Sequence, residues 1–336
     1  GLRNLGNTCF MAAGLQCLTA TPPVLRHFLD LQQRGEKLPP PGSLMAHFSA
    51  LLGKMWSGKY SVLRPTEFKQ TLGAYHSQFK DYRQHDCQEF LALLLDSLHE
   101  QMNTAKYLGS PIGELDSIAN SPRGSPLNDE TQDEIEADKH WAKHLKSNRS
   151  IIVDTFQGQF KSKVVCAVCN HVSVTYEPFM YLSVPLPHAM ERQILYDCLQ
   201  AFSQSETLDE HNPWFCPKCE RNRCATKTLT VHRYPKFLIV YLKRYIFFVF
   251  YECTSMKLDD KVTFPLVGLS VGQHLYDLYA CVCHFGGVSA GHYTAYAKNP
   301  RTDTWYYYND EITSRQKPQE EDFSNAYILF YSRQGT

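Results

Sequence analysis

The chain has 336 residues, of which 43% are hydrophobic and 13% aromatic, so it can bury a sizeable core as one large domain or two. Its 34 basic and 34 acidic residues balance to a formal net charge of zero. This balance argues against binding to nucleic acid or to an anionic membrane surface. The most apolar stretch, 237–250, is interrupted by Lys243 and Arg244 and is too short to span a membrane.

The first predicted helix begins at or near Cys9, because a polar turn at 4–8 precedes it and apolar residues then recur at helical spacing. A thiol at a helix N-terminus meets unsatisfied N–H groups and the positive end of the helix dipole, and both favour thiolate over thiol. The backbone N–H of Cys9 and the side-chain amide of Asn4 can together hold an oxyanion. A single cysteine in such a place is nevertheless more often a buried core residue.

Further helices are predicted as far as residue 102, so this part of the chain is largely helical. One starts at the prolines after Thr21, two more span 44–56 and 66–75, and another starts after Asp86. Asp86 and Glu89, three residues later, resemble a capping box. Residues 103–140 are different, because they are rich in Ser, Pro, Gly and acidic residues and lack periodicity. We predict that they form a flexible insertion.

From residue 150 onward, short runs of β-branched and aromatic residues alternate with turns, which is typical of strands. One helix is predicted among them, near 194–202. Helices first and strands afterwards indicate an α+β fold. The strand-like runs are 156–166, 171–187, 229–251, 275–285, 292–299, 304–310 and 326–331.

Two CxxC pairs, Cys166 with Cys169 and Cys216 with Cys219, are separated by 46 residues. Each pair follows a strand-like run and lies in a polar turn, so the four thiolates can surround one zinc ion tetrahedrally. Such a zinc ion is structural, because four protein ligands leave no position open for substrate. The chain has 12 cysteines, which is sparse for its length, and this usage favours a reducing compartment, cytoplasmic or nuclear.

A cysteine nucleophile needs a base within reach and a group that orients that base. His292 follows a glycine-rich loop and enters a predicted strand, which places it well to face a cleft. Asn309 and Asp310 come 17 residues later, a spacing that allows an antiparallel hairpin to bring them beside His292. Either side chain can accept from the imidazole. Taken alone, His292 is more often structural and Asn-Asp is only a turn signal.

The order Cys, His, Asn is that of papain-like proteases, and the flanks of these residues resemble the ubiquitin-specific proteases, a family of papain-like cysteine deubiquitinases. The resemblance covers almost the whole chain except the insertion. The matching segments are GLRNLGNTCFM, QHDCQEF, DTFQGQFKSKVVCAVC, YLSVPLP, NPWFCPKC, LIVYLKRY, KLDDKVTFPL, GHYTAYAKN, WYYYNDEIT and AYILFY.

This resemblance implies one catalytic domain over 1–336, with a helical thumb (1–102), the insertion (103–140), zinc-stapled β fingers (150–235) and a β-rich palm (236–336). It implies a monomer that binds ubiquitin and ubiquitinated proteins and hydrolyses the bond after the terminal glycine of ubiquitin through a thioester. The implied structural cofactor is Zn²⁺, and no nucleic acid or membrane partner is implied.

The resemblance also implies a role for each matching residue. Cys9 is the nucleophile, His292 the general base and acid, and Asn4 the oxyanion donor. Asn309 matches the third position of the triad, and Asp310 can share or assume that role. The channel for the extended ubiquitin tail is lined by Gln84, Asp86, Gly291 and Tyr293.

One departure from the family pattern is Ala12-Ala13, where relatives usually have Asn and a small residue. The loss of a polar contact near the active site can lower activity, so a ubiquitin-binding protein without turnover is one alternative. A papain-like hydrolase for another ubiquitin-like modifier is a second. A zinc-centred nucleic-acid binder is disfavoured by the neutral charge.

Overall fold

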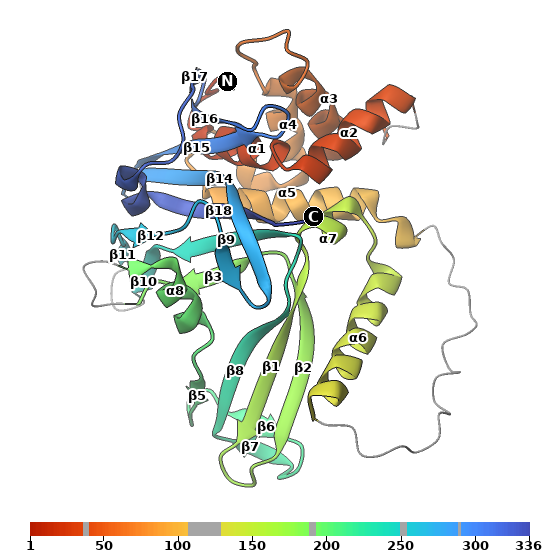
Figure 1. Cartoon of the computed structure of the whole chain (residues 1–336), viewed down its shortest axis with the longest axis vertical. Coiled ribbons are helices and arrows are strands. Elements are labelled where there is room, and N and C mark those ends of the chain that lie inside the picture. Colours follow the sequence, from red (N-terminus) through yellow and green to blue (C-terminus); the bar gives the residue numbers. More distant parts are fainter. Residues whose placement is uncertain (36–39, 107–128, 188–192, 249–253, 288–289) are drawn as a thin grey trace.

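The computed structural model describes residues 1–35, 40–106, 129–187, 193–248, 254–287 and 290–336. A helical lobe packs against one side of a central sheet, and a second, elongated sheet extends away from both (Figure 1). This arrangement confirms the predicted α+β fold. No helix in the described ranges combines the length and the apolar character needed to cross a bilayer.

The helical lobe, which we call the thumb, is organised around its first helix. All eleven residues of this helix are buried, because it packs between the central sheet and the last helix of the thumb. Gly14 permits the close approach, since a Cβ there would lie 3.0 Å from the ring of Phe90. The thumb helices are α1 (Cys9–Thr19), α2 (Pro22–Arg34), α3 (Leu44–Met55), α4 (Thr66–Tyr75) and α5 (Cys87–Met102).

Asp86 caps α5 as the sequence pattern indicated. Its Oδ1 accepts from the backbone N–H groups of Gln88 at 2.7 Å and of Glu89 at 3.1 Å. These bonds satisfy two donors that the first turn of the helix leaves free. They also fix the Asp86 side chain at the point where the thumb meets the central sheet.

The central sheet, which we call the palm, has the strand order β17-β16-β15-β14-β18-β9-β3, with β13 paired to β14. All pairs are antiparallel except β3 with β9. The palm strands are β3 (Leu182–Pro185), β9 (Phe237–Lys243), β13 (Leu269–Val271), β14 (His274–Gly286), β15 (Gly291–Asn299), β16 (Thr304–Asn309), β17 (Ile312–Ser314) and β18 (Ala326–Arg333).

The second sheet, which we call the fingers, has the order β2-β1-β8-β5, and a two-stranded tip, β6 with β7, lies at its far end (Figure 1). Small pairs join β4 (Gln193–Ile194) to β12 (Val262–Thr263) and β10 (Tyr245–Phe248) to β11 (Thr254–Lys257). The finger strands are β1 (Gly158–Cys166), β2 (Val172–Phe179), β5 (Glu206–Leu208), β6 (Trp214–Cys216), β7 (Arg221–Arg223) and β8 (Ala225–Arg233).

The predicted helix near 194–202 is confirmed as α8 (Leu195–Phe202). The boundary between fingers and palm is more complex than a division at residue 235. β3 lies within the range that we assigned to the fingers, but it pairs with β9 at the edge of the palm. The chain therefore visits the palm once before it completes the fingers.

Two helices occupy positions where the sequence pattern indicated none, α6 (Asp129–Ser147) and α7 (Ile151–Phe156). The prediction of a flexible insertion is therefore wrong for 129–140, and 107–128 lies outside the described residues. α6 is a charged helix that lies beside the fingers (Figure 1), and it is bound there partly by ion pairs. Asp133 pairs with Lys161, and Asp138 pairs with Arg233 at 2.5 Å.

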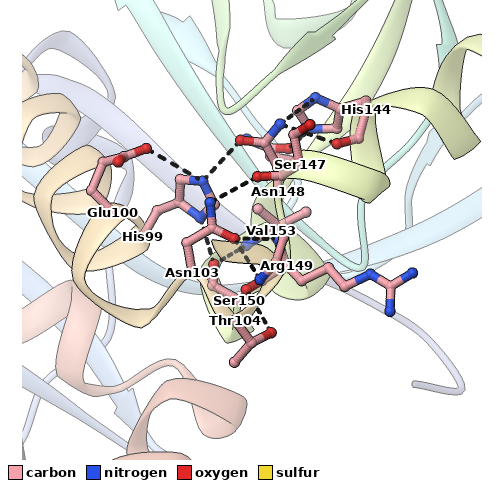
Figure 2. Close-up of polar contacts among 12 residues, drawn as sticks. His99, Glu100, Asn103, Thr104, His144, Ser147, Asn148, Arg149, Ser150 and Val153 are labelled. Atoms are coloured by element: carbon pink, nitrogen blue, oxygen red, sulfur yellow. Dashed lines mark hydrogen bonds and ion pairs between the residues drawn. The ribbon is translucent and has the colours of Figure 1, made fainter. Parts of the chain in front are cut away.

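A buried polar junction connects the end of α5 to the residues between α6 and α7 (Figure 2). His99 on α5 contacts Ser150 Oγ through Nδ1 at 2.8 Å and Asn148 Oδ1 through Nε2 at 3.1 Å. Asn103 Oδ1 accepts from the backbone N–H of Arg149 at 2.9 Å. Because these groups are satisfied by one another, the junction fixes α6 and α7 to the end of α5.

Candidate active site and metal centre

Cys9 is the first residue of α1 and lies where the thumb meets the palm. Its side chain is buried, and its sulfur accepts a backbone hydrogen bond from Tyr293, near the start of β15. The preceding turn is held by Asn4, whose Oδ1 accepts from the N–H groups of Gly6 at 2.9 Å and Thr8 at 3.2 Å. The thiol is therefore fixed from the thumb side by a rigid turn and from the palm side by a strand.

The Cys9 thiol does not have the lowered pKa that its place at a helix N-terminus favours. Burial raises its pKa, and the negative charge of Asp310 raises it further. Backbone N–H groups of Tyr293, Phe10 and Cys9 itself act in the opposite direction, as expected at a helix start, but they do not outweigh burial. In the free protein, the effect of the helix N-terminus on the Cys9 pKa is therefore present but smaller than the effect of burial.

This raised pKa predicts how Cys9 reacts in the absence of substrate. Its alkylation by iodoacetamide, followed by mass spectrometry of the Cys9 peptide, should keep accelerating above pH 9, the ordinary thiol value, because only the thiolate reacts. A thiol with a lowered pKa would instead reach its maximal rate near neutral pH. A rate that levels off below pH 7 would contradict the electrostatic account given above.

His292 and Asn309 are brought together by the β15–β16 hairpin. The register pairs Ala295 with Tyr308, so Asn309 lies diagonally across from His292 on the same face of the sheet. His292 Nε2 is 2.7 Å from Asn309 Oδ1. An amide oxygen can only accept, so Nε2 carries the proton and Nδ1 is left as the basic nitrogen.

Asp310 lies beside this pair and connects it to the turn before Cys9. Its Oδ2 accepts from Asn4 Nδ2 at 3.1 Å and is 3.9 Å from His292 Nε2. Its Oδ1 is buried with no hydrogen-bond partner among the described residues. The structure thus brings Asn4, His292, Asn309 and Asp310 into one contiguous network.

The remaining predicted residues line a cleft of about 340 Å³ that Cys9 also lines. Gln84 and Asp86 come from the thumb, and Gly291 and Tyr293 come from the palm. His292, Asn4, Asn309 and Asp310 are not part of this lining, but Gly291 and Tyr293, the two neighbours of His292 in the chain, are. The cleft therefore runs along the boundary between thumb and palm and includes the thiol in its wall.

Sequence reasoning missed an aromatic wall of the same cleft, formed in part by His284 and Tyr245. His284 Nδ1 is 2.8 Å from the Tyr245 hydroxyl, and burial lowers the pKa of His284 to about 4, so the ring is neutral. The Tyr327 hydroxyl donates to Asp86 Oδ2 and thereby joins this wall to the cap of α5. The position of His284 on the strand paired with that of His292 was the available signal.

The four predicted metal ligands converge at the end of the fingers. The sulfur atoms of Cys166, Cys169, Cys216 and Cys219 all lie within 4.8 Å of one another. The Cys169 and Cys216 sulfurs are 3.6 Å apart, close to the separation of about 3.8 Å that tetrahedral zinc requires at a Zn–S distance of about 2.3 Å. The donor set therefore fits a metal ion.

The local backbone supports this fit. The residue after each pair, Asn170 or Glu220, has a positive φ of 54° or 53°, so both turns fold back in the same way. The N–H of Cys219 points at Cys216 Sγ at 3.4 Å, which stabilises negative charge on that sulfur. Cys224 is adjacent, since its carbonyl accepts from Ala167, but it is not among the four clustered thiols.

Comparison with known proteins agrees with this arrangement. Residues 1–331 match the family model described as ubiquitin carboxyl-terminal hydrolase. The sequence is 35% identical to ubiquitin carboxyl-terminal hydrolase 4 of Saccharomyces cerevisiae, over 99% of this chain and 39% of the relative. It is 36% identical to ubiquitin carboxyl-terminal hydrolase Usp2 of Drosophila melanogaster, over 99% of this chain and 34% of the relative. The chain thus spans less than half of the length of each of these relatives.

Solved structures of SAGA DUB modules, one of them from yeast, have the same fold. One, which contains a mutant Sgf73, has a TM-score of 0.72 and 27% identity over 100% of this chain and 68% of its own. Another, in which a Ubp8 variant is bound to monoubiquitin, has a TM-score of 0.72 and 23% identity over 100% and 69%. Fold, site and family match define a cysteine-hydrolase architecture. The chain belongs to the ubiquitin carboxyl-terminal hydrolase family.

Proposed function

We propose that this chain is a deubiquitinase that hydrolyses the peptide or isopeptide bond after the C-terminal glycine of ubiquitin. The observation that carries the proposal is the arrangement of side chains where the thumb meets the palm. There, the buried thiol of Cys9 lies in the wall of a cleft that Gly291 and Tyr293 also line, and Asn309 holds Nε2 of His292, the residue between those two in the chain. Family membership supports ubiquitin as the substrate, and the geometry supports a thiol mechanism.

In the acylation step, Nδ1 of His292 takes the proton of Cys9, and the sulfur attacks the carbonyl carbon of the terminal glycine. This proton transfer compensates for the raised pKa of the thiol. The oxyanion that forms is stabilised by the backbone N–H of Cys9 and by the Asn4 amide, whose Nδ2 carries two hydrogens. His292 then protonates the departing amine, and a thioester to Cys9 remains.

Deacylation reverses these roles. His292 takes a proton from water, the resulting hydroxide attacks the thioester carbonyl, and Cys9 leaves with the proton restored. Asn309 holds the imidazole in the tautomer that both steps need. Asp310 stabilises the imidazolium from 3.9 Å and also orients Asn4, so it serves the base and the oxyanion donor together.

The cleft explains how a ubiquitin-like tail can be selected. Gln84 on the thumb side is hydrogen-bonded to Gly291 on the palm side at 3.0 Å, so the cleft is narrow there, and an extended tail of small residues fits where bulkier chains are excluded. We also propose that the four clustered cysteines bind structural zinc, which staples β1 to the β6–β7 tip and stiffens the fingers. The chemical step does not involve the metal.

No disulfide joins the cysteines that the structure describes, which fits a reducing compartment, and we propose a cytoplasmic or nuclear location. Binding to ubiquitin is proposed to use the fingers and the cleft in one copy of the chain. The solved structures bound to ubiquitin aldehyde and to monoubiquitin support this substrate by analogy.

The test is steady-state cleavage of fluorogenic amides attached to the C-terminus of ubiquitin and of other ubiquitin-like modifiers. We expect turnover of the ubiquitin amide with a higher kcat/KM than for the other modifiers. Preference for another modifier would change the substrate assignment. If the parent chain binds ubiquitin tightly without turnover and Ala12→Asn restores turnover, the parent is a binding protein that has lost a polar contact. Ala12 is buried in α1 near Cys9.

A further inference from the structure

The loop that carries Gln84 and Asp86 is held in place by more than its own backbone. This loop, 79–86, joins a 3-10 turn (Ser77–Phe79) to α5, and we call it the thumb loop. Its outer residues are exposed, but it forms the thumb side of the cleft next to Cys9. A side chain that determines its conformation therefore influences the proposed reaction from outside the cleft.

Lys69 on α4 lies beneath this loop, and only 3% of its surface is exposed. Its ammonium donates to the carbonyl oxygens of Phe79 and of Asp81, the latter at 2.9 Å, and lies 4.8 Å from the centroid of the Tyr82 ring. A lysine has three donors, and three groups of the loop are thus arranged around it.

The carboxylate of Asp81 organises the upper half of the loop. It accepts from the backbone N–H of Arg83 at 3.1 Å and from Arg83 Nε at 2.5 Å, and it contacts His85 Nε2 at 3.1 Å. These hydrogen bonds lower the pKa of Asp81 to about 2, with the Arg83 N–H as the largest cause. Gln84 lies between two residues that are both fixed to Asp81.

Gln84 then connects the thumb loop to the palm through two hydrogen bonds to one residue. Its Nε2 donates to the carbonyl of Gly291 at 3.0 Å, and its Oε1 accepts from the N–H of Gly291 at 3.0 Å. On the other side, His284 leaves no space, since a Cβ at Gly291 would lie 2.1 Å from its Nε2. Gly291 is thereby fixed from both sides, and it directly precedes His292.

We propose that Lys69 is a positioning residue, which holds the thumb loop so that Gln84 clamps Gly291 beside the catalytic histidine. Burying an ammonium is unfavourable because the charge loses its hydration, and an apolar side chain of similar length would avoid that cost. The contacts of Lys69 are to loop carbonyls that no apolar side chain can bind. The kinetic part of this inference rests on the proposed function, whereas the structural part does not.

The structural part is tested by amide hydrogen exchange at Gly291, measured by NMR on the whole chain. Lys69→Met should accelerate exchange of this amide about tenfold, and Gln84→Ala should do the same, because both release the bond to Gln84 Oε1. Lys80→Met is the matched control, since Lys80 is exposed on the same loop, and it should leave the rate unchanged. Unchanged exchange in folded Lys69→Met would overturn the proposal.

If Lys69→Met does not fold, Lys69→Gln keeps a shorter polar side chain and serves the same test.

The kinetic arm measures kcat/KM for the ubiquitin amide below the melting temperature in Lys69→Met, Gln84→Ala and the double variant. We expect each single change to lower it about tenfold and the double variant to lose no more, because both act through one clamp. Losses that multiply to about a hundredfold would overturn the proposal.

The two arms separate the possible failures. If the parent chain does not cleave the ubiquitin amide, the proposed function fails, but exchange at Gly291 still decides whether Lys69 holds the clamp. If the parent cleaves the amide and Lys69→Met changes only the melting temperature, Lys69 is a structural residue and the proposal is wrong.

Discussion

Replacing Cys9 with alanine is expected to lower kcat/KM for a ubiquitin amide by about a thousandfold or more, because no other group can form the acyl intermediate. Ubiquitin binding should remain within a few-fold of the parent, since a methyl group in place of the thiol leaves the cleft and the fingers unchanged. Turnover is measured with the fluorogenic amide, and binding is measured by calorimetry.

Cys17→Ala provides the matched control for this prediction. Cys17 lies on the same helix and is buried as completely, but its sulfur faces the carbonyl of Tyr296 instead of the cleft. This variant should lose some stability, because a small cavity forms in the core, and it should keep its turnover. Normal cleavage by Cys9→Ala, or loss of cleavage in folded Cys17→Ala, would show that the nucleophile is misassigned.

Removal of the metal is the second change with a large expected effect. Structural zinc contributes about 10–16 kcal/mol of apparent binding free energy in zinc-finger peptides at neutral pH, and that energy is available for folding. We therefore expect chelation, or Cys216→Ser, to unfold the β6–β7 tip and to weaken ubiquitin binding. Elemental analysis should find about one zinc per chain in the parent, and hydrogen exchange should increase in the fingers.

Cys224→Ser is the control, because Cys224 is next to the four clustered thiols without belonging to them. It should retain the metal and the ordered fingers. A folded parent chain that contains no metal would remove the zinc assignment. Fingers that stay protected from exchange after the metal is removed would show that it does not staple them.

The parts of the site that the sequence predicted well are those in which local spacing determines geometry. A hairpin of antiparallel strands brings residues about 17 apart together, so the sequence placed both Asn309 and Asp310 beside His292, and the structure gives the hydrogen bond to Asn309. The two CxxC turns could likewise be combined into one cluster, because each turn presents two sulfurs on the same side. The start of α1 at Cys9 followed from a polar turn and an apolar period.

The parts that it missed depend on contacts between distant elements. α6 has no long apolar stripe, and its interactions with the fingers include ion pairs such as Asp138 with Arg233, which no local pattern reveals. The net direction of the Cys9 pKa shift could not be predicted for the same reason, because the burial that raises this pKa comes from tertiary packing of the thumb against the palm. The sequence alone predicts that Lys69 is an ordinary exposed residue of a helix, whereas the structure buries it beneath the thumb loop.

The most direct measurement of the central claim uses ubiquitin that carries an electrophile at its C-terminus. After incubation with the parent chain, intact mass and peptide mapping should show one ubiquitin joined to Cys9, and the Cys9→Ala variant should show none. This result requires a reactive thiol in the cleft and a ubiquitin tail that reaches it. An adduct on a different cysteine, or no adduct from a chain that hydrolyses the ubiquitin amide, would contradict the assignment of Cys9.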